Sequence, residues 1–337
     1  MGLTEWKPTF RVTVDGEDIT AILAPRLVSL SVTDAAGVES DAAEFSLTDT
    51  SPFAPLAEPP PGAEVRVWLG YFPRPRYMGL YIADSVSRQG PPDSMTVRAV
   101  ASPQGTTTQG KTAITEQRTR SWPAGTSLGQ MVARIAADHG MQAAVAPSLA
   151  SVALPHFDQI DESDINLISR VARVYDAAAK PGDGKLVVAR RGESLAVTGE
   201  ALPVVDLGLR DVTSWSSRLS LRAQAGSVIA IWRDKAAGKD IEEKVGDGEP
   251  VRRLRRRFAT QDEARAAAQT ERDRSKRGER SLSLTMPGRT DIMAEGRVRL
   301  RGFRREIDTD WLITSVTHSL SDGGYQTSLQ AEPPPET

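Results

Sequence analysis

Two segments of the sequence that lie far apart along the chain resemble each other. Residues 81–87 align without gaps on residues 311–317, an offset of 230 positions (311 − 81). Three shorter matches precede these residues and come in the same order along both segments: residues 46–48 with 283–285, 65–67 with 298–300, and 70–71 with 302–303. Ordered self-similarity of this kind indicates a duplicated structural unit. The chain is therefore predicted to contain two related domains.

Both segments have the pattern of antiparallel β-strands. Apolar and polar residues alternate in several short runs, for example at Val28, Leu30 and Val32. Period-two alternation buries one face of a sheet and leaves the other in water, as in a small barrel or sandwich. We therefore predict a first β-barrel over residues 1–103 and a similar second barrel over residues 202–331, with residues 332–337 as a tail.

The region between the two barrels has the periodicity of helices. Ser127 and Gln130 form a capping-box pair ahead of an apolar helical stripe, and Asp161 is the predicted N-cap of a second helix. A strand is predicted around residues 186–188. Residues 104–201 should thus form an α+β domain, which a polar linker at residues 106–110 joins to the first barrel.

The second barrel should carry a helical insertion around residues 259–278. Thr260 and Glu263 form its predicted N-cap, and Gly278 its stop. This helix has few large apolar residues, so it should lie on a surface or bridge to a neighbour. The predicted fold class is mainly β, α+β overall.

The composition excludes several classes of function. The chain of 337 residues has a formal net charge of −2, so no overall field attracts it to nucleic acid or to an anionic membrane. It contains no cysteine, which excludes disulfides, thiol nucleophiles and thiolate metal sites. We find neither a secretory signal nor an apolar run approaching the ~20 residues that span a bilayer.

The histidines and clustered aspartates do not have the spacing of a metal or catalytic motif. His139, His156 and His318 lie in separate segments, and the sequence has no H-E-x-x-H spacing. His139 is interpreted as a partner of a helix C-terminus, and His318 as an exposed or interface residue of a strand. Asp158, Asp161 and Asp164 lack the glycine and distal glutamate of a calcium loop, so helix capping is the preferred interpretation. We expect no catalytic residue, metal or cofactor.

The strongest local charge feature is a run of arginines. It comprises Arg252, Arg253, Arg255, Arg256 and Arg257. One interpretation is contact with another subunit or an acidic partner, and a second is a solvated strand whose arginines pair with nearby carboxylates. Nucleic-acid binding is a third interpretation, although the sequence has no helix-turn-helix or zinc motif to support it.

An ordered set of segments resembles a known family. In the first barrel these are residues 27–34, 41–47, 62–71, 79–82 and 90–92; residues 162–164 and the helix after them follow; the second barrel adds residues 212–215, 282–288, 298–303 and 311–320. With these segments in this order, the chain resembles the late control gene D family of contractile-tailed phages, which are tail hub proteins. It is also similar to the hub portion of the valine-glycine repeat spike proteins of type VI secretion. The resemblance spans nearly the whole chain.

The resemblance implies a structural role and a set of partners. Such hubs are homotrimers whose paired barrels make a pseudo-sixfold ring, and they join a hexameric tail tube or tube initiator to a trimeric spike protein. Baseplate wedge proteins and the tape measure protein are further implied partners, and assembly in the bacterial host cytoplasm into a virion tail is implied. Because the sequence stops at Thr337 without a β-helical extension, we expect the spike to be a separate chain.

Two other functions compete with the hub. One is a tail-associated peptidoglycan hydrolase on the same scaffold, since paired carboxylates need not be close along a chain. The other is a nucleic-acid-binding regulator that uses the arginine run.

Overall fold

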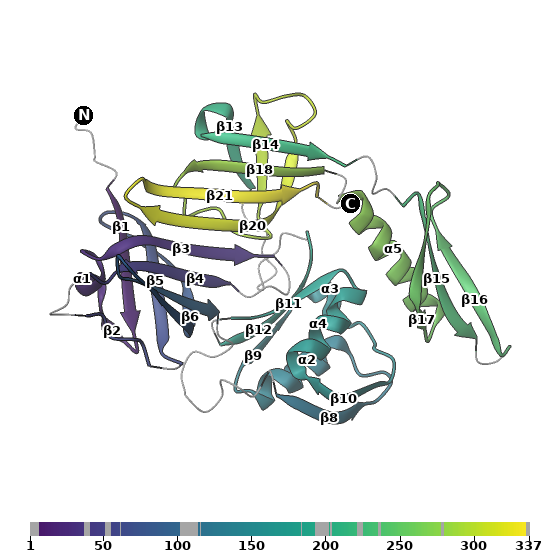
Figure 1. Ribbon diagram of the computed structural model, residues 1–337. Helices are drawn as coiled ribbons and strands as arrows, with labels where there is room; N and C mark the ends of the chain where they lie inside the picture. The colour runs from purple at the N-terminus through teal and green to yellow at the C-terminus, as the bar shows by residue number, and fades with distance from the viewer. Residues whose placement is uncertain are drawn as a thin grey trace.

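The computed structural model describes residues 7–36, 41–50, 55–60, 62–101, 114, 116–182, 184–192, 202, 204–220, 225–234, 237–277 and 280–334. Within these residues the strands form one 13-stranded sheet and three small sheets (Figure 1). The predicted mainly β fold class is confirmed. The expected linker at residues 106–110 lies outside the described residues.

The first barrel is a run of antiparallel strands with a short helix at one end. Its elements are β1 (Pro8–Val14), β2 (Glu17–Asp18), α1 (Thr20–Leu23), β3 (Leu27–Ala35), β4 (Ala42–Thr48), β5 (Glu64–Tyr71), β6 (Arg76–Gln89) and β7 (Ser94–Ala101). Across the sheet they follow the order β3-β4-β7-β6-β5-β1-β2. Alternate residues such as Leu30, Phe45 and Val67 fill a shared apolar core, which is the burial that the period-two pattern predicts.

The second barrel repeats this strand order. Its elements are β13 (Val204–Gly208), the 3₁₀ turn η1 (Leu209–Asp211), β14 (Ser214–Leu219), β18 (Arg280–Pro287), β19 (Arg297–Arg301), β20 (Asp310–Ser321) and β21 (Gly324–Glu332). They follow the order β14-β18-β21-β20-β19-β13. One difference is that β13 runs parallel to β19, whereas β1 runs antiparallel to β5. Trp311, Leu284 and Val298 lie in its core.

The two copies match in register as well as in order. The β6–β7 ladder is irregular between Ala83 and Ser85, and the β20–β21 ladder is irregular between Ile313 and Ser315. These positions are separated by the same offset of 230 (313 − 83) that the sequence match indicated. The predicted duplication is therefore confirmed, down to one β-bulge.

One of the sequence matches was wrong by two positions. Val97 and Leu329 are equivalent, because they pair with Val86 and Val316 of the two copies. Val97 pairs in turn with Phe45, and Leu329 with Leu284. Phe45 therefore corresponds to Leu284, so residues 46–48 do not correspond to residues 283–285. A two-residue slip keeps every side chain on its face, so alternation alone could not detect it.

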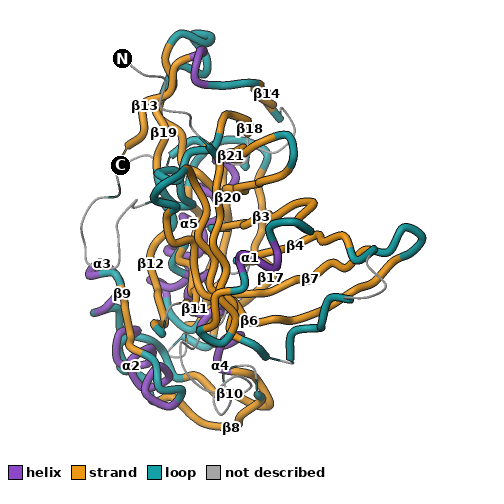
Figure 2. Tube along the Cα trace, turned by 90° about the vertical axis from the view of Figure 1, so that its left-hand side faces the viewer, coloured by secondary structure: helices purple, strands orange, loops and turns teal. Residues whose placement is uncertain are grey.

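The two barrels share one continuous sheet. Residues 29–35 of β3 pair antiparallel with residues 315–321 of β20, which lie near opposite ends of the sequence. Figure 1 shows β20 in yellow beside β3 in purple, and the turned view of Figure 2 shows the same order of β18, β21, β20 and β3. The barrels are thus joined edge to edge by backbone pairing.

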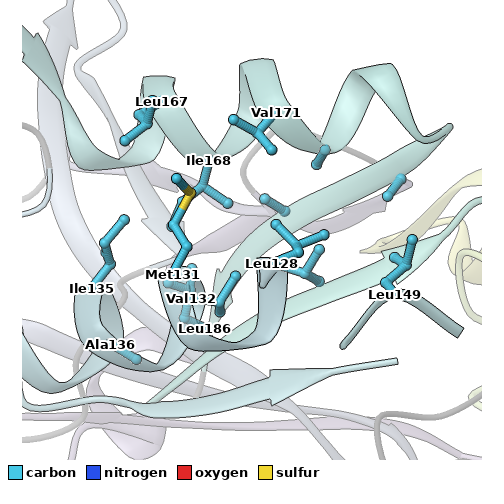
Figure 3. Close-up of a cluster of buried hydrophobic side chains, with 14 of the residues drawn as sticks. Leu128, Met131, Val132, Ile135, Ala136, Leu149, Leu167, Ile168, Val171 and Leu186 are labelled. Carbon is cyan, nitrogen blue, oxygen red and sulfur yellow. The ribbon is translucent and has the colours of Figure 1, made fainter. Parts of the chain in front are cut away.

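The middle region is α+β and packs beside the barrels. Its elements are β8 (Gln117–Trp122), α2 (Leu128–Asp138), β9 (Gln142–Val145), α3 (Pro147–Ala150), β10 (Phe157–Ser163), α4 (Asp164–Val174), β11 (Ala177–Gly182) and β12 (Lys185–Arg190). The Ser127–Gln130 capping box is present as predicted. Leu128, Met131 and Ile135 of α2 meet Leu167 and Ile168 of α4 in a single apolar core (Figure 3).

The insertion in the second barrel is larger than the predicted helix. Between β14 and β18 the chain forms β15 (Ser227–Asp234), β16 (Lys239–Val245), β17 (Val251–Phe258) and α5 (Gln261–Arg277). Residues 228–232 fall within the range predicted for the second barrel, but they belong instead to a separate three-stranded sheet. Their periodicity shows that they form a strand but not which strands it pairs with.

Helix α5 covers this small sheet. Ala264, Ala267 and Ala268 pack on Val228, Ala230 and Phe258, which form a separate core. The predicted Thr260 cap is present, since the Glu263 N–H donates to the Thr260 hydroxyl at 3.3 Å. Gly278, the predicted stop, lies outside the described residues.

Candidate assembly surfaces

The arginine run forms the strand β17, which lies at one edge of the insertion sheet. The order of that sheet is β16-β15-β17, and all five arginines of the run are exposed. Three of them pair with carboxylates of the same insertion. Arg252 lies 2.8 Å from Glu271, Arg253 2.5 Å from Glu242, and Arg257 3.1 Å from Asp240. Much of the positive charge is therefore balanced within the chain.

Arg256 takes part in a different contact. Its guanidinium lies 5.4 Å from the ring centre of Phe258, a cation–π contact. It also lines a cleft of about 260 Å³ between α4 and the insertion, with Arg170, Arg173 and Arg274. Thr270 of α5 donates a hydrogen bond of 3.3 Å to the Val174 carbonyl, which holds the two units together there. Subunit or partner contact by the run stays a prediction.

A DNA column tests the nucleic-acid interpretation of the run. At physiological salt we expect the protein to pass over immobilised duplex DNA without retention, because phosphate binding needs several free cations and three of these arginines already face carboxylates. The double substitution Arg255→Glu, Arg256→Glu should elute at the same volume. A retained protein whose retention disappears on that substitution would restore the regulator hypothesis.

A buried carboxylate organises the middle region. Asp164, at the first position of α4, is fully buried and accepts hydrogen bonds from Gln159 at 2.8 Å and His139 at 2.7 Å. Arg120 donates to the same carboxylate and also reaches Asp138 at 2.7 Å. Burial raises the pKa of Asp164, but the bonds from Gln159, His139 and Arg120 outweigh it and hold that pKa below its usual value. This network ties α2, α4 and both strands of the β8–β10 pair together.

Two predictions about this region change. The N-cap of α4 is Ser163 rather than Asp161, which has a positive φ of 45° and bonds Thr119. His139 lies at the C-terminus of α2 as expected, but its ring is buried against Asp164. His156 pairs at the surface with Asp158, at 3.2 Å. Among the described residues, no group of three or more histidines, aspartates or glutamates could hold a metal ion.

The junction between the barrels contains a half-buried ion-pair cluster that no sequence pattern indicates. Lys180 of β11 extends from the middle region to Asp34 of β3 at 2.9 Å and to Asp41 at 2.5 Å. Asp34 also accepts the Ala294 N–H from the second barrel at 2.8 Å. Three parts of the chain thus meet at one β-strand. The contributing residues are 146 and 260 positions from Asp34 along the chain, so no local pattern could reveal them.

The environment separates the pKa values of the two aspartates. Burial raises the pKa of Asp41 to about 6, with the nearby Asp34 charge adding to the rise and Lys180 opposing it. For Asp34, burial also raises the pKa, but the Lys180 ammonium and the Ala294 N–H outweigh it, so the pKa is lowered. Because both carboxylates are held by one ammonium, the cluster is suited to fastening the middle region to the barrels.

His318 also lies in this junction, facing the core. It is only 2% exposed and pairs with Val32 across the β3–β20 ladder. Its Nδ1 atom lies 3.1 Å from the Thr327 hydroxyl and 3.0 Å from the Tyr325 hydroxyl. Burial lowers the pKa of His318 to about 4. The expected exposure of His318 is therefore wrong, because its ring is buried within the chain.

The first barrel has an apolar cavity of about 230 Å³ at the end covered by α1. Its lining includes Ile22, Leu23, Phe45, Leu56 and Val97, and among the described residues Glu58 is its one carboxylate. Glycoside hydrolysis needs two carboxyl groups flanking one bond, and the lining of this cavity does not supply a pair. No helix in the described part of the chain is long and apolar enough to cross a membrane.

The chain is thus a duplicated barrel whose two copies are joined edge to edge by backbone pairing. Comparison with known proteins identifies the class more narrowly. The model of the phage tail baseplate hub (GPD) family matches residues 56–324, and the chain belongs to this family.

Individual relatives agree with this assignment. The probable baseplate hub protein of Escherichia phage P2 is 30% identical, over 96% of this chain and 93% of that protein. A tail protein from Neisseria meningitidis MC58 has a similar fold, with a TM-score of 0.73, 13% identity and coverage of 97% of both chains. The E. coli protein c3393, a component of the type VI secretion system, has a TM-score of 0.59 at 13% identity, over 98% of this chain and 77% of that one.

Proposed function

We propose that three copies of this chain close into a ring of six similar barrels that joins a hexameric tail tube to a trimeric central spike. The observation that carries this proposal is the repeated strand order, β3-β4-β7-β6-β5-β1 and β14-β18-β21-β20-β19-β13, within one sheet. A ring of three such chains presents six similar barrels to one partner and three identical chains to another. The proposed role is therefore structural rather than catalytic.

The contacts support a part that transmits force. The two barrels share a seven-residue backbone ladder, and the Asp34–Lys180–Asp41 cluster fastens the middle region to it. Such a joint resists bending because separating it would leave backbone groups and charges unpaired. We infer that the tube, the spike, the wedge proteins and the tape measure protein contact other faces of this ring, and that it assembles in the host cytoplasm.

The mass in solution tests the ring. Light scattering on the purified chain should give about 109 kDa (3 × 36.4 kDa), the mass of a closed trimer. Electron microscopy of that species should show a six-lobed ring. A protein that remains at 36.4 kDa, even after tube and spike proteins are added, would contradict the proposal.

A further inference from the structure

The pairing of β20 with β3 is a template for the contact between neighbouring subunits. In this ladder Val316 lies opposite Asp34, Thr317 opposite Thr33, and His318 opposite Val32. The ladder joins β20, the long strand of the second barrel, to β3, the strand at which the sheet order of the first barrel begins. Each barrel has both kinds of strand, so the same junction can be formed again at the unused edges.

The copy of β20 is β6, and the copy of β3 is β14. The shared bulge equates Ser85 with Ser315, and so Val86 with Val316. For the other strand, Phe45 and Leu284 are the equivalent residues of the neighbouring strands β4 and β18. Leu30 pairs with Phe45 and Trp215 pairs with Leu284, so Leu30 corresponds to Trp215. The offsets are therefore 230 (315 − 85) for the long strand and 185 (215 − 30) for the other.

Both copies have an edge that is unpaired within the described chain. Residues 85–89 of β6 pair with β7 on one side, while β5 reaches only as far as Ile82 on the other. β14 pairs with β18 and ends the path of the 13-stranded sheet. In the described residues, no backbone hydrogen bond outside these ladders involves either edge.

Exposure agrees with missing partners at these edges. Ser85, Ser87 and Arg88 are exposed, whereas their copies Ser315, Thr317 and His318 are covered or buried under β3. Leu219 of β14 is 48% exposed. A bare strand edge with an exposed leucine is a feature that monomeric proteins usually cover.

We propose that β6 of one subunit pairs antiparallel with β14 of the next, in the register of the β20–β3 ladder. The offsets place Val86 opposite Leu219, Ser87 opposite Arg218, and Arg88 opposite Ser217. This inference rests on the proposed trimer and adds the strands and the register that close it. Because the contact joins two different edges, it is head to tail, and it forms a closed ring when the rotation is one third of a turn.

Paired cysteines test this register directly. In the template, the Thr33 and Thr317 hydroxyls lie 3.3 Å apart, so side chains at the equivalent Ser87 and Arg218 should be within disulfide reach across the interface. The natural chain has no cysteine to interfere. After mild oxidation, the Ser87→Cys, Arg218→Cys double variant should give covalent dimers and trimers on a non-reducing gel. Co-expressed single variants should stop at dimers.

The matched control shifts one cysteine along the same face. Ser87→Cys with Ser214→Cys places the thiols four residues out of register, about 13 Å apart along the strand, which is too far for a disulfide. Light scattering could show a trimer in which Ser87→Cys forms a disulfide with Ser214→Cys but not with Arg218→Cys, or with neither. That result would overturn the proposed register but not the trimer. A chain that is monomeric at every concentration would overturn both.

A charge placed on the bare edge gives a second test that does not need oxidation. Leu219→Arg should fold normally, since Leu219 is exposed, and should weaken trimer formation at least about tenfold by placing a charge against Val86. Ile160→Arg is the control, because Ile160 is 68% exposed and lies in β10, at the far end of the molecule from β14 (Figure 1). Equal trimer masses for the two variants would count against the β6–β14 contact.

Discussion

Replacing Asp164 with alanine should destabilise the middle region by about 3–5 kcal/mol, the cost of removing one member of a buried charge network. The carboxylate is fully buried, and its loss would leave Arg120, His139 and Gln159 without their shared acceptor. Amide hydrogen exchange followed by mass spectrometry should show faster exchange in α2 and α4. Peptides from β20 and β21 should keep their wild-type rates, since local stability differs between parts of one structure.

Asp158→Ala is the matched control for this experiment. Asp158 lies in β10, the strand that leads into α4, but its side chain is 54% exposed and pairs with His156 at the surface. Its removal should leave exchange in α2 and α4 almost unchanged. If the two variants exchange alike, the network contributes far less than its geometry indicates.

Acid should weaken the joint between the two barrels through His318. Its pKa is about 4 in the folded protein, against 6.5 in the unfolded chain. The folded state therefore binds fewer protons between these values, so the free energy of unfolding falls as the pH drops from 6.5 to 4. The loss should reach about 3 kcal/mol at pH 4 and should be absent above pH 6.5.

A non-titrating variant isolates this effect from other groups. His318→Asn keeps a hydrogen-bond acceptor near Thr327 and Tyr325 but cannot gain a charge. Urea denaturation at pH 7 and pH 4 should show a pH-dependent loss about 3 kcal/mol smaller in the variant than in the wild type. An identical pH dependence would mean that His318 is not the group that responds.

The alternation of apolar residues and the 230-position match were sufficient to predict the two barrels. They succeeded because a half-buried strand must alternate, and because the match at residues 81–87 includes the bulge that fixes the register. The same alternation could not reveal the small sheet of the insertion. Residues 228–232 have the pattern of a barrel strand, and strand pairing depends on contacts that periodicity does not encode.

The junction could be predicted only in part. The position of His318 in the repeat identified it as an equivalent of Arg88, but its burial depends on β3, which is more than 280 residues away in sequence. Lys180 belongs to no motif of the sequence, although it holds Asp34 and Asp41. Buried polar contacts of this kind require the tertiary fold before they can be recognised.

The β3–β20 ladder also determines when during synthesis a subunit can be completed. The ribosome must add 280 residues (315 − 35) after Ala35 before the first partner residue of β20 exists. At about 5–20 residues per second, β3 waits roughly 14–56 s with one edge bare. Non-local pairing of this kind slows folding and exposes a strand to its neighbours in the meantime. Nascent chains on one message are therefore at risk of pairing with each other before each has closed its own sheet.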